Sequence, residues 1–297
     1  MTTEELEEDQ LETILQGIKI PSPPQLLVDL QMEMLELDPS LDRIAEYITA
    51  DPGMSGGIIK TVRSPFYGVD EEIGSMKQAV LLLGMKTVMN IITTLSVRSE
   101  TECSELSQVQ LSFMNRFWDS CVDIAKAASL VAMQTRLVNP DMAYMAGMFS
   151  NTGIALMMQR FDDYPDVLRE SYTGVDKRIV DTENRHYSTN HAVLGYYMAK
   201  SWKLPKLVCD VIPIHHNAAE LFAKRDDKGS ELLDVLATIK LAEHAARMYQ
   251  NVAGSDQDHE WETIADDVLY YAGLSEDEFI DLVNGIRDQG IGVHSYL

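Results

Sequence analysis

Residues 183–217 read ENRHYSTNHAVLGYYMAKSWKLPKLVCDVIPIHHN and hold four of the seven histidines in the chain. The Ser-Thr-Asn run before His191 is typical of a helix N-cap, and the apolar residues that follow recur at helical spacing. The pattern predicts a helix of about a dozen residues that ends near Lys203, because Leu204 precedes a proline and such residues disfavour the α conformation.

Pro205 is well placed to begin a second helix, whose apolar positions lead to His215 and His216 at its end. Two antiparallel helices joined by a short turn place the start of the first beside the end of the second. The sequence therefore predicts that the imidazoles of His191, His215 and His216 converge.

Converging imidazoles can hold a metal ion, although metal sites in helical bundles usually also carry carboxylates at fixed helical offsets. This stretch has one Glu-x-x-His pair, Glu183 with His186, and no second pair faces it. For each of these histidines we therefore favour a hydrogen-bonded or solvated side chain over a metal ligand.

Short motifs follow one another along the rest of the chain: PSPP at 21–24, DP at 51–52, RSPFYG at 63–68, AVLLLG at 79–84, WKLP at 202–205 and HH at 215–216. In this order they resemble the HDOD domain, a bacterial signalling relative of the HD-superfamily metal-dependent phosphohydrolases. The resemblance covers roughly residues 15–250. It implies an all-α fold, a multi-helix bundle of the HDOD type with two packed helical subdomains.

The expected division of the chain follows changes in composition. We expect an acidic N-terminal arm at 1–14, an N-terminal helical subdomain at 15–105 and a degenerate HD-like helical subdomain at 106–297. The boundary is drawn at the polar, acidic run 99–108, which separates two apolar, helix-patterned regions. No stretch shows the alternation of a β-strand.

The resemblance also identifies where catalytic ligands would stand. HD hydrolases hold their metals with one His, an adjacent His-Asp pair and a later Asp. By alignment of the flanking residues, Ser120 replaces the first His, Ser150 and Asn151 replace the pair, and Glu243 replaces the late Asp. Neutral hydroxyl and amide groups bring no charge to a divalent cation. The resemblance therefore implies a pseudo-enzyme with no bound metal or cofactor, with four remnant metal-ligand candidates: His191, His215, His216 and Glu243.

The charge of the chain bears on its partners. There are 24 Lys and Arg residues against 47 Asp and Glu residues, a net charge of −23. So acidic a chain disfavours direct nucleic-acid binding, and we expect protein partners instead. No apolar run approaches membrane-spanning length, so no membrane insertion is expected. The sequence leaves open whether the protein forms a homodimer.

The cysteines bear on the compartment. The three cysteines are scattered without Cys-x-x-Cys spacing, at Cys103, Cys121 and Cys209. No signal peptide is recognisable at the N-terminus. These features fit a protein of the reducing cytoplasm.

One N-terminal loop is a further candidate for a ligand or a partner. Arg63, Phe66 and Tyr67 place a cation and two aromatic rings beside a turn, as in a functional surface loop. The alternative is that the two rings pack between helices, and we favour packing.

We therefore expect a non-catalytic bacterial signal-transduction module that acts through protein contacts. One alternative is a residual metal-dependent phosphohydrolase or phosphodiesterase, in which the three converging histidines and either Glu183 or Glu243 rebuild a metal site. The other is a small-ligand sensor that uses the vestigial cavity around Ser120, Asn151, His191 and His215.

Overall fold

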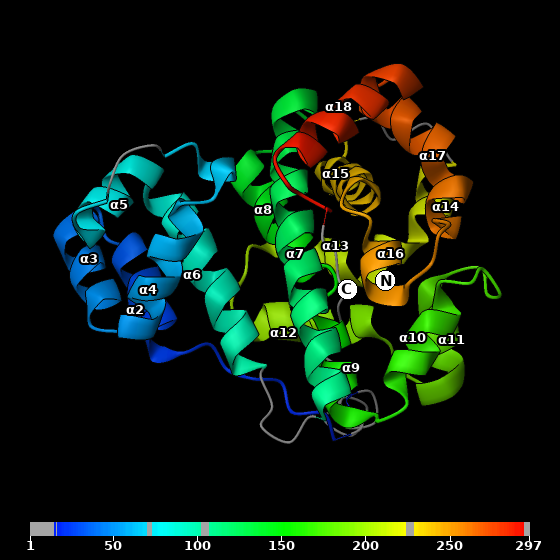
Figure 1. Cartoon of the computed structure of the whole chain (residues 1–297), viewed down its shortest axis with the longest axis horizontal. Coiled ribbons are helices and arrows are strands. Elements are labelled where there is room, and N and C mark those ends of the chain that lie inside the picture. The colour runs from blue at the N-terminus through cyan, green and yellow to red at the C-terminus, as the bar shows by residue number, and fades with distance from the viewer. Residues whose placement is uncertain (1–14, 16, 70–72, 102–106, 224–228, 294–297) are drawn as a thin grey trace. The chain divides into compact units, whose positions relative to one another are not determined.

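The computed structural model describes residues 15, 17–69, 73–101, 107–223 and 229–293. The predicted acidic arm at 1–14 and Cys103 lie outside the described residues. In the described part of the chain every regular element is a helix and none is a strand (Figure 1). The all-α prediction is confirmed.

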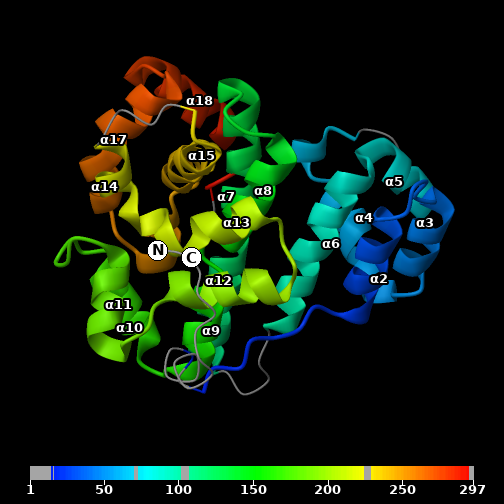
Figure 2. The same ribbon diagram turned by 180° about the vertical axis from the view of Figure 1, so that it is seen from behind.

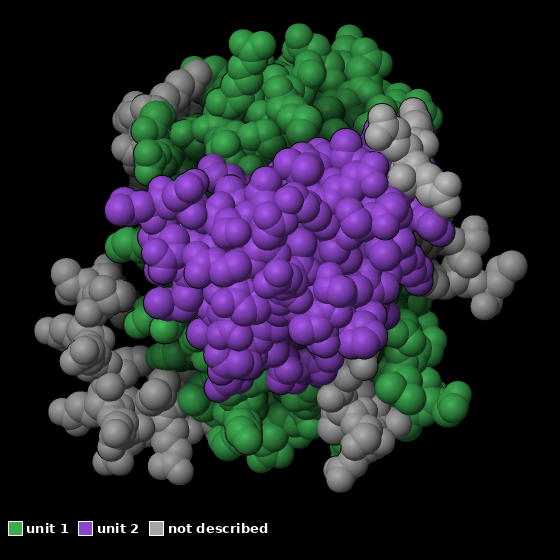
Figure 3. Space-filling view, turned by 90° about the vertical axis from the view of Figure 1, so that its left-hand side faces the viewer, with its two compact units in different colours: residues 1–21, 103–297 green, residues 22–102 purple. Residues whose placement is uncertain are grey.

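The chain divides into two compact units (Figure 3). Unit 2 comprises Ser22–Glu102, and unit 1 comprises Met1–Pro21 together with Cys103–Leu297. Each unit has its own buried apolar core.

Unit 2 is built from short helices that begin where the sequence places its capping residues. Its elements are α2 (Gln25–Met34), α3 (Leu41–Thr49), α4 (Pro52–Val62), the 3-10 helix η1 (Pro65–Tyr67), α5 (Met76–Leu83) and α6 (Met85–Glu100). The side chains of Ser40 and Asp51 accept hydrogen bonds from backbone N–H groups of the first turns of α3 and α4. Gly84, with φ of 78°, separates α5 from α6.

Among the described helices, none alone is long and apolar enough to cross a bilayer. The pair α5 and α6 meets the requirement only when both are taken together across a bend of 112°.

Unit 1 holds the longest helix and the histidine-rich stretch (Figure 2). Its elements are α7 (Gln108–Thr135), α8 (Pro140–Phe149), α9 (Gly153–Arg160), α10 (Tyr164–Ser171), α11 (Ile179–Tyr187), α12 (His191–Ser201), α13 (Lys206–Val211), the 3-10 helix η2 (Ile212–Asn217), α14 (Ala218–Phe222), α15 (Glu231–Ala245), α16 (Met248–Ala253), α17 (His259–Ala272) and α18 (Glu276–Asp288).

Helix α15 is the centre of unit 1. It is seen end-on in Figures 1 and 2, with α7, α8 and α17 packed against it. From Val235 to Glu243 all of its residues are buried, including the charged Lys240. A helix that is buried on every side carries polar groups only where partners meet them.

The histidine-rich stretch folds as a helix, a turn and a second helix, with one difference from the prediction. Asn190 caps α12 by accepting a hydrogen bond from Val193 N, and α12 ends at Ser201. The second helix was expected to reach the histidine pair, but α13 stops at Val211 and the pair lies on η2. Pro213 explains the change, because it has no N–H to continue the α-helical hydrogen bonds.

Helices α9 and α12 approach so closely that one position admits only glycine. A Cβ atom placed on Gly153 would lie 1.9 Å from the carbonyl oxygen of His191 and 2.8 Å from Gly195 N. Both neighbours are backbone atoms, so the added atom would have to push α12 away. Gly153 therefore fixes the position of His191.

We expect Gly153→Ala to lower the free energy of unfolding by about 3 kcal/mol, because it overpacks a backbone contact. Gly285→Ala is the matched control, since Gly285 is exposed in α18 and the added Cβ meets nothing within 4 Å. That control is expected to raise stability by about 0.5–1 kcal/mol through its higher helix propensity. Urea unfolding measures both. Equal effects of the two substitutions would contradict the close approach of the helices.

Candidate functional site

Three buried histidines converge in unit 1, as the sequence predicted. His191 is the first residue of α12, and His215 and His216 lie on η2. The Nε2 atom of His191 lies 3.1 Å from Nε2 of His216 and 3.5 Å from Nε2 of His215. All three residues are at most 4% exposed. The fourth histidine of the stretch, His186, is outside this group and contacts Glu170 at 3.2 Å.

Glu183 holds His191 from behind. The Nδ1 atom of His191 lies 2.7 Å from Glu183 Oε2, and the backbone N–H of His191 donates to the same oxygen at 3.0 Å. The Tyr164 hydroxyl donates to the other carboxylate oxygen. Burial and the Glu183 charge raise the pKa of Tyr164, so its hydroxyl stays protonated. Glu183 therefore fixes the orientation of the His191 ring through Nδ1 and does not contact Nε2 of that ring.

The other two imidazoles are held in the same way. His215 Nδ1 donates to the backbone carbonyl of Ile212 at 2.6 Å, and His216 Nδ1 donates to Glu260 Oε1 at 2.8 Å. Burial and neighbouring cationic groups lower the pKa values of His215 and His216 well below the ordinary value, which favours the neutral rings.

The partners determine the tautomers. Each of the three Nδ1 atoms faces an oxygen that can only accept, so we assign the Nδ1 hydrogen to each ring. In a neutral imidazole the other nitrogen then carries a lone pair. The neutral rings of His215 and His216 therefore direct Nε2 lone pairs toward Nε2 of His191.

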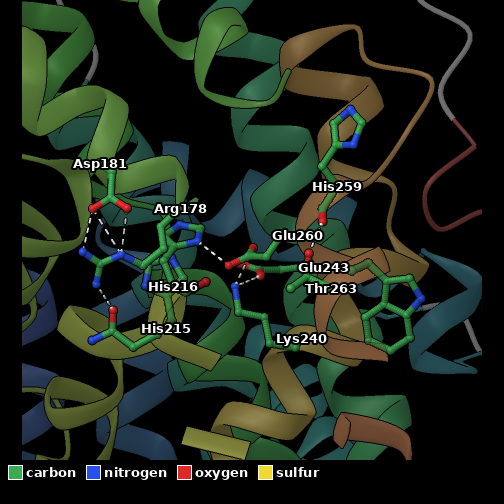
Figure 4. Close-up of polar contacts among 12 residues, drawn as sticks. Arg178, Asp181, His215, His216, Lys240, Glu243, His259, Glu260 and Thr263 are labelled. Atoms are coloured by element: carbon green, nitrogen blue, oxygen red, sulfur yellow. Dashed lines mark hydrogen bonds and ion pairs between the residues drawn. The ribbon is translucent and has the colours of Figure 1, made fainter. Parts of the chain in front are cut away.

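An internal cation lies beside the histidines (Figure 4). Lys240 Nζ lies 2.8 Å from Glu243 Oε2 and 3.0 Å from Glu260 Oε2, and its side chain is 2% exposed. Burial opposes its charge, but the two carboxylates raise the pKa of Lys240 above its ordinary value. Burial raises the pKa of Glu243, and Lys240 acts against that rise.

Sequence reasoning missed the role of Lys240. The available signal was a lysine three residues before Glu243, within the run 235–242 whose other residues are apolar except Thr238. Such a lysine is rarely buried without a carboxylate partner. Glu243, predicted as a remnant metal ligand, is therefore engaged by an ammonium group.

The three residues expected to replace the hydrolase ligands, Ser120, Ser150 and Asn151, are buried and neutral. Ser120 lies on α7, and its hydroxyl has no hydrogen-bond partner within the described part of the chain. Ser150 donates to the carbonyl of Gly147 at 3.1 Å, and Asn151 donates to Glu243 Oε1 at 2.8 Å. These side chains do not fit the divalent-metal site of HD hydrolases, because none offers an imidazole or a carboxylate.

Two small cavities reach His216. One, of about 20 Å³, is lined by His216, Lys240 and Glu243 together with aromatic residues of α16 and α17. The other, of about 30 Å³, lies between η2 and α17 and includes Arg178. A cavity of about 10–15 Å³ holds one water molecule. Each cavity therefore has room for one or two waters.

The N-terminal loop candidates are placed separately. Arg63 is exposed, and the Phe66 and Tyr67 rings meet edge to face with centroids 4.9 Å apart. These three residues belong to unit 2, whereas every residue of the histidine group belongs to unit 1.

Comparison with known proteins finds one protein family. The family model of the HDOD domain matches residues 20–218. An uncharacterized protein of Treponema pallidum (strain Nichols) is 22% identical over 202 residues, which cover 67% of this chain and 38% of that protein. The uncharacterized protein YuxH of Bacillus subtilis (strain 168) is 29% identical over 122 residues, or 41% of this chain and 28% of that protein. The chain thus spans less than two fifths of the length of these relatives.

Solved structures share the fold at low sequence identity. An HDOD domain protein of unknown function from Geobacter sulfurreducens has a TM-score of 0.60 and 18% identity, covering 95% of this chain and 98% of its own. A candidate phosphohydrolase from Shewanella amazonensis has a TM-score of 0.66 and 18% identity, with coverages of 94% and 95%. A candidate signal transduction protein from Marinobacter aquaeolei has a TM-score of 0.67 and 15% identity, with coverages of 95% and 64%.

The internal cation gives a stability prediction. Lys240→Met leaves the carboxylates of Glu243 and Glu260 without their ammonium partner, and should lower the free energy of unfolding by about 2–4 kcal/mol. Lys206→Met is the matched control, because that side chain is 87% exposed in its ion pair with Asp210. The control should change stability by less than about 0.5 kcal/mol.

A double substitution separates charge from packing. Combining Lys240→Met with Glu243→Gln removes one stranded charge, so its cost should be smaller than the sum of the two single costs. Urea unfolding of the four proteins of this cycle measures the coupling. Additive losses in the free energy of unfolding would show that Lys240 does not stabilise the protein through its ion pair with Glu243.

Proposed function

Because the chain belongs to the HDOD domain family, we propose that it is a non-catalytic regulatory module of bacterial signal transduction that acts through contacts with other proteins. One observation carries the proposal against catalysis. Ser120, Ser150 and Asn151 stand where the family resemblance implies the hydrolase ligands, and the Glu243 carboxylate, which accepts from Asn151, is bound to Lys240. The side chains at these three positions do not supply the ligands of a metal ion that activates water for attack on a phosphoester.

Access to the histidines supports the same proposal. Two cavities that reach His216 have volumes of about 20 and 30 Å³. A drug-sized ligand occupies a pocket of about 300–1,000 Å³, and a phosphodiester substrate is of that size. The volumes disfavour a residual phosphodiesterase, and equally a small-ligand sensor at this site.

The regulatory part of the proposal rests on kinship and charge. The candidate signal transduction protein from Marinobacter aquaeolei shares this fold. The net charge of −23 opposes binding to phosphate backbones and suits basic protein surfaces. Protein contact is the mode of action that requires no reaction centre.

Hydrolysis assays test the catalytic half. The purified chain, supplied with Mn²⁺, Fe²⁺ or Zn²⁺, is expected to cleave cyclic dinucleotides, nucleotides and bis-p-nitrophenyl phosphate no faster than metal alone. His191→Ala and His215→Ala proteins should give the same background rate. A metal-dependent rate that either substitution abolishes would overturn the proposal.

Partner capture tests the other half, using the loop at 63–68. Arg63 is an exposed cation beside two aromatic rings, so Arg63→Glu should reduce capture of a specific protein from the source cell by tenfold or more if this loop docks it. Lys86→Glu is the control, because it makes the same charge change at another exposed position of unit 2. Quantitative mass spectrometry of the captured proteins is the measurement. Indistinguishable profiles for the two variants would exclude this loop as the docking site.

A further inference from the structure

We propose that the cavity between α15, α17 and α18 binds one aromatic side chain of a partner protein, with Lys or Arg residues of the partner on either side of that ring. The three helices lie together in unit 1 (Figures 1 and 2), after residues 20–218, which the HDOD family model matches. The residues that line this cavity include none of His191, His215 and His216. This docking site rests on the protein-contact function proposed above, to which it adds the chemistry of the partner.

The size of the cavity suits one large side chain. Its volume is about 310 Å³, at the lower end of the range of about 300–1,000 Å³ for pockets that hold small molecules. Aromatic side chains seated in such pockets dominate the energy of many protein interfaces. A cavity of this volume has no room for a second ring and the main chain that carries it.

Three stacked rings form one wall of the cavity. The ring centroids of His244 and Trp261 lie 4.6 Å apart with planes 21° from parallel, and those of Trp261 and Phe279 lie 5.1 Å apart. Asp258 holds the imidazole of His244 through a contact of 2.9 Å to Nδ1. Ala265, one turn after Trp261 on α17, also lines the cavity, and its short side chain leaves space beside the indole. The wall therefore offers an apolar π surface to a further ring.

Arg287 gives the cavity a hydrogen-bond donor that is not used within the described part of the chain. Its side chain lines the cavity, and its Nε atom is buried with no hydrogen-bond partner there. A buried donor without an acceptor is unfavourable and is rare in folded proteins. A main-chain carbonyl of a bound segment can accept this hydrogen bond, and every protein segment carries such carbonyls.

The charge around the cavity selects a basic partner. Asp266 and Glu276 line the cavity and are exposed. Helix α18 holds five Asp or Glu residues against one Arg, and α17 holds four against no Lys or Arg. Carboxylates at the edge of an interface attract complementary charges and fix the orientation of the partner. A cation beside the seated ring also gains from the faces of the aromatic wall.

A pair of synthetic peptides tests the site. The probe is Gly-Ser-Lys-Lys-Phe-Lys-Lys-Ser-Gly, and its control has Ala in place of Phe and so keeps the charge. Emission from Trp261 reports binding at the cavity, because Trp118 and Trp202 are at most 1% exposed. Titration of the full chain at physiological ionic strength should show that the control peptide binds at least tenfold more weakly, the loss typical of an aromatic anchor. Equal affinities of the two peptides, or no binding of either, would overturn the proposal.

Free L-phenylalanine separates a protein partner from a small ligand. It lacks the flanking cations, so it should bind at least tenfold more weakly than the probe peptide. An affinity equal to that of the peptide would show that the cavity is a small-molecule site, and would overturn the proposal.

Variants of the protein locate the binding. Ala265→Leu fills the cavity and should weaken binding of the probe by tenfold or more, whereas Ala272→Leu, its matched control on the same helix, should not, because Ala272 does not line the cavity. Glu276→Gln should weaken binding more than Asp277→Asn, since Asp277 is exposed on the same turn but does not line the cavity. Far-UV circular dichroism shows whether each variant is folded.

The two proposals can fail separately. Unchanged affinity in a folded Ala265→Leu protein would exclude this cavity as the docking site, and if that variant does not fold, the comparison of Glu276→Gln with Asp277→Asn and the peptide pair still decide. Failure of the peptide to bind leaves the regulatory function as it was. Metal-dependent hydrolysis overturns the regulatory function whatever the peptide does.

Discussion

The hydrogen bonds of Glu183 join the helices α10, α11 and α12 of unit 1. This carboxylate is fully buried and accepts from three groups: the Tyr164 hydroxyl on α10, and the backbone N–H and Nδ1–H of His191 on α12. A buried carboxylate without such donors would be costly, so α10, α11 and α12 must all be in place before it is satisfied. Glu183 fixes the orientation of the His191 ring, and Nε2 of that ring faces Nε2 of His215 and Nε2 of His216.

Backbone packing imposes the same position on His191 from the opposite direction. Gly153 begins α9, directly after the Ser150 and Asn151 positions, and its α-carbon lies against the carbonyl of His191. The start of α9 therefore lies in close backbone contact with α12. Packing of backbone against backbone, which requires no catalytic side chain, holds this contact.

The sequence predicted the elements that local chemistry determines. The cap predicted in the Ser-Thr-Asn run before His191 is Asn190, because capping depends on one side chain and the next backbone N–H groups. Convergence of the three histidines followed from two helices and a short turn. The 3-10 form of η2 was missed although Pro213 was visible in the sequence.

The roles of Glu183 and Lys240 could not be predicted from local patterns, because they depend on contacts across the fold. Glu183 meets Tyr164, which lies 19 positions earlier in the chain, and Lys240 meets Glu260, which lies 20 positions later. The position of Lys240 three residues before Glu243 indicated one carboxylate partner. It did not indicate that the lysine is buried. Tertiary contact alone decides whether such a pair is a surface ion pair or part of a buried network.

A buried ionic network can persist without any function, since removing a single partner strands a charge and costs about 3–5 kcal/mol. Stability alone accounts for Glu183, Lys240 and Glu260, each of which is satisfied by its neighbours. It also accounts for the Nδ1 side of every ring. It does not account for the Nε2 side, where stability would be served equally well by apolar contacts or by hydrogen-bond donors. His215 and His216 there direct neutral Nε2 acceptors at Nε2 of His191, an arrangement that a proton or a cation between the nitrogens stabilises. The arrangement of the Nε2 atoms is thus the part of the network that depends on the proton or ion held between the rings.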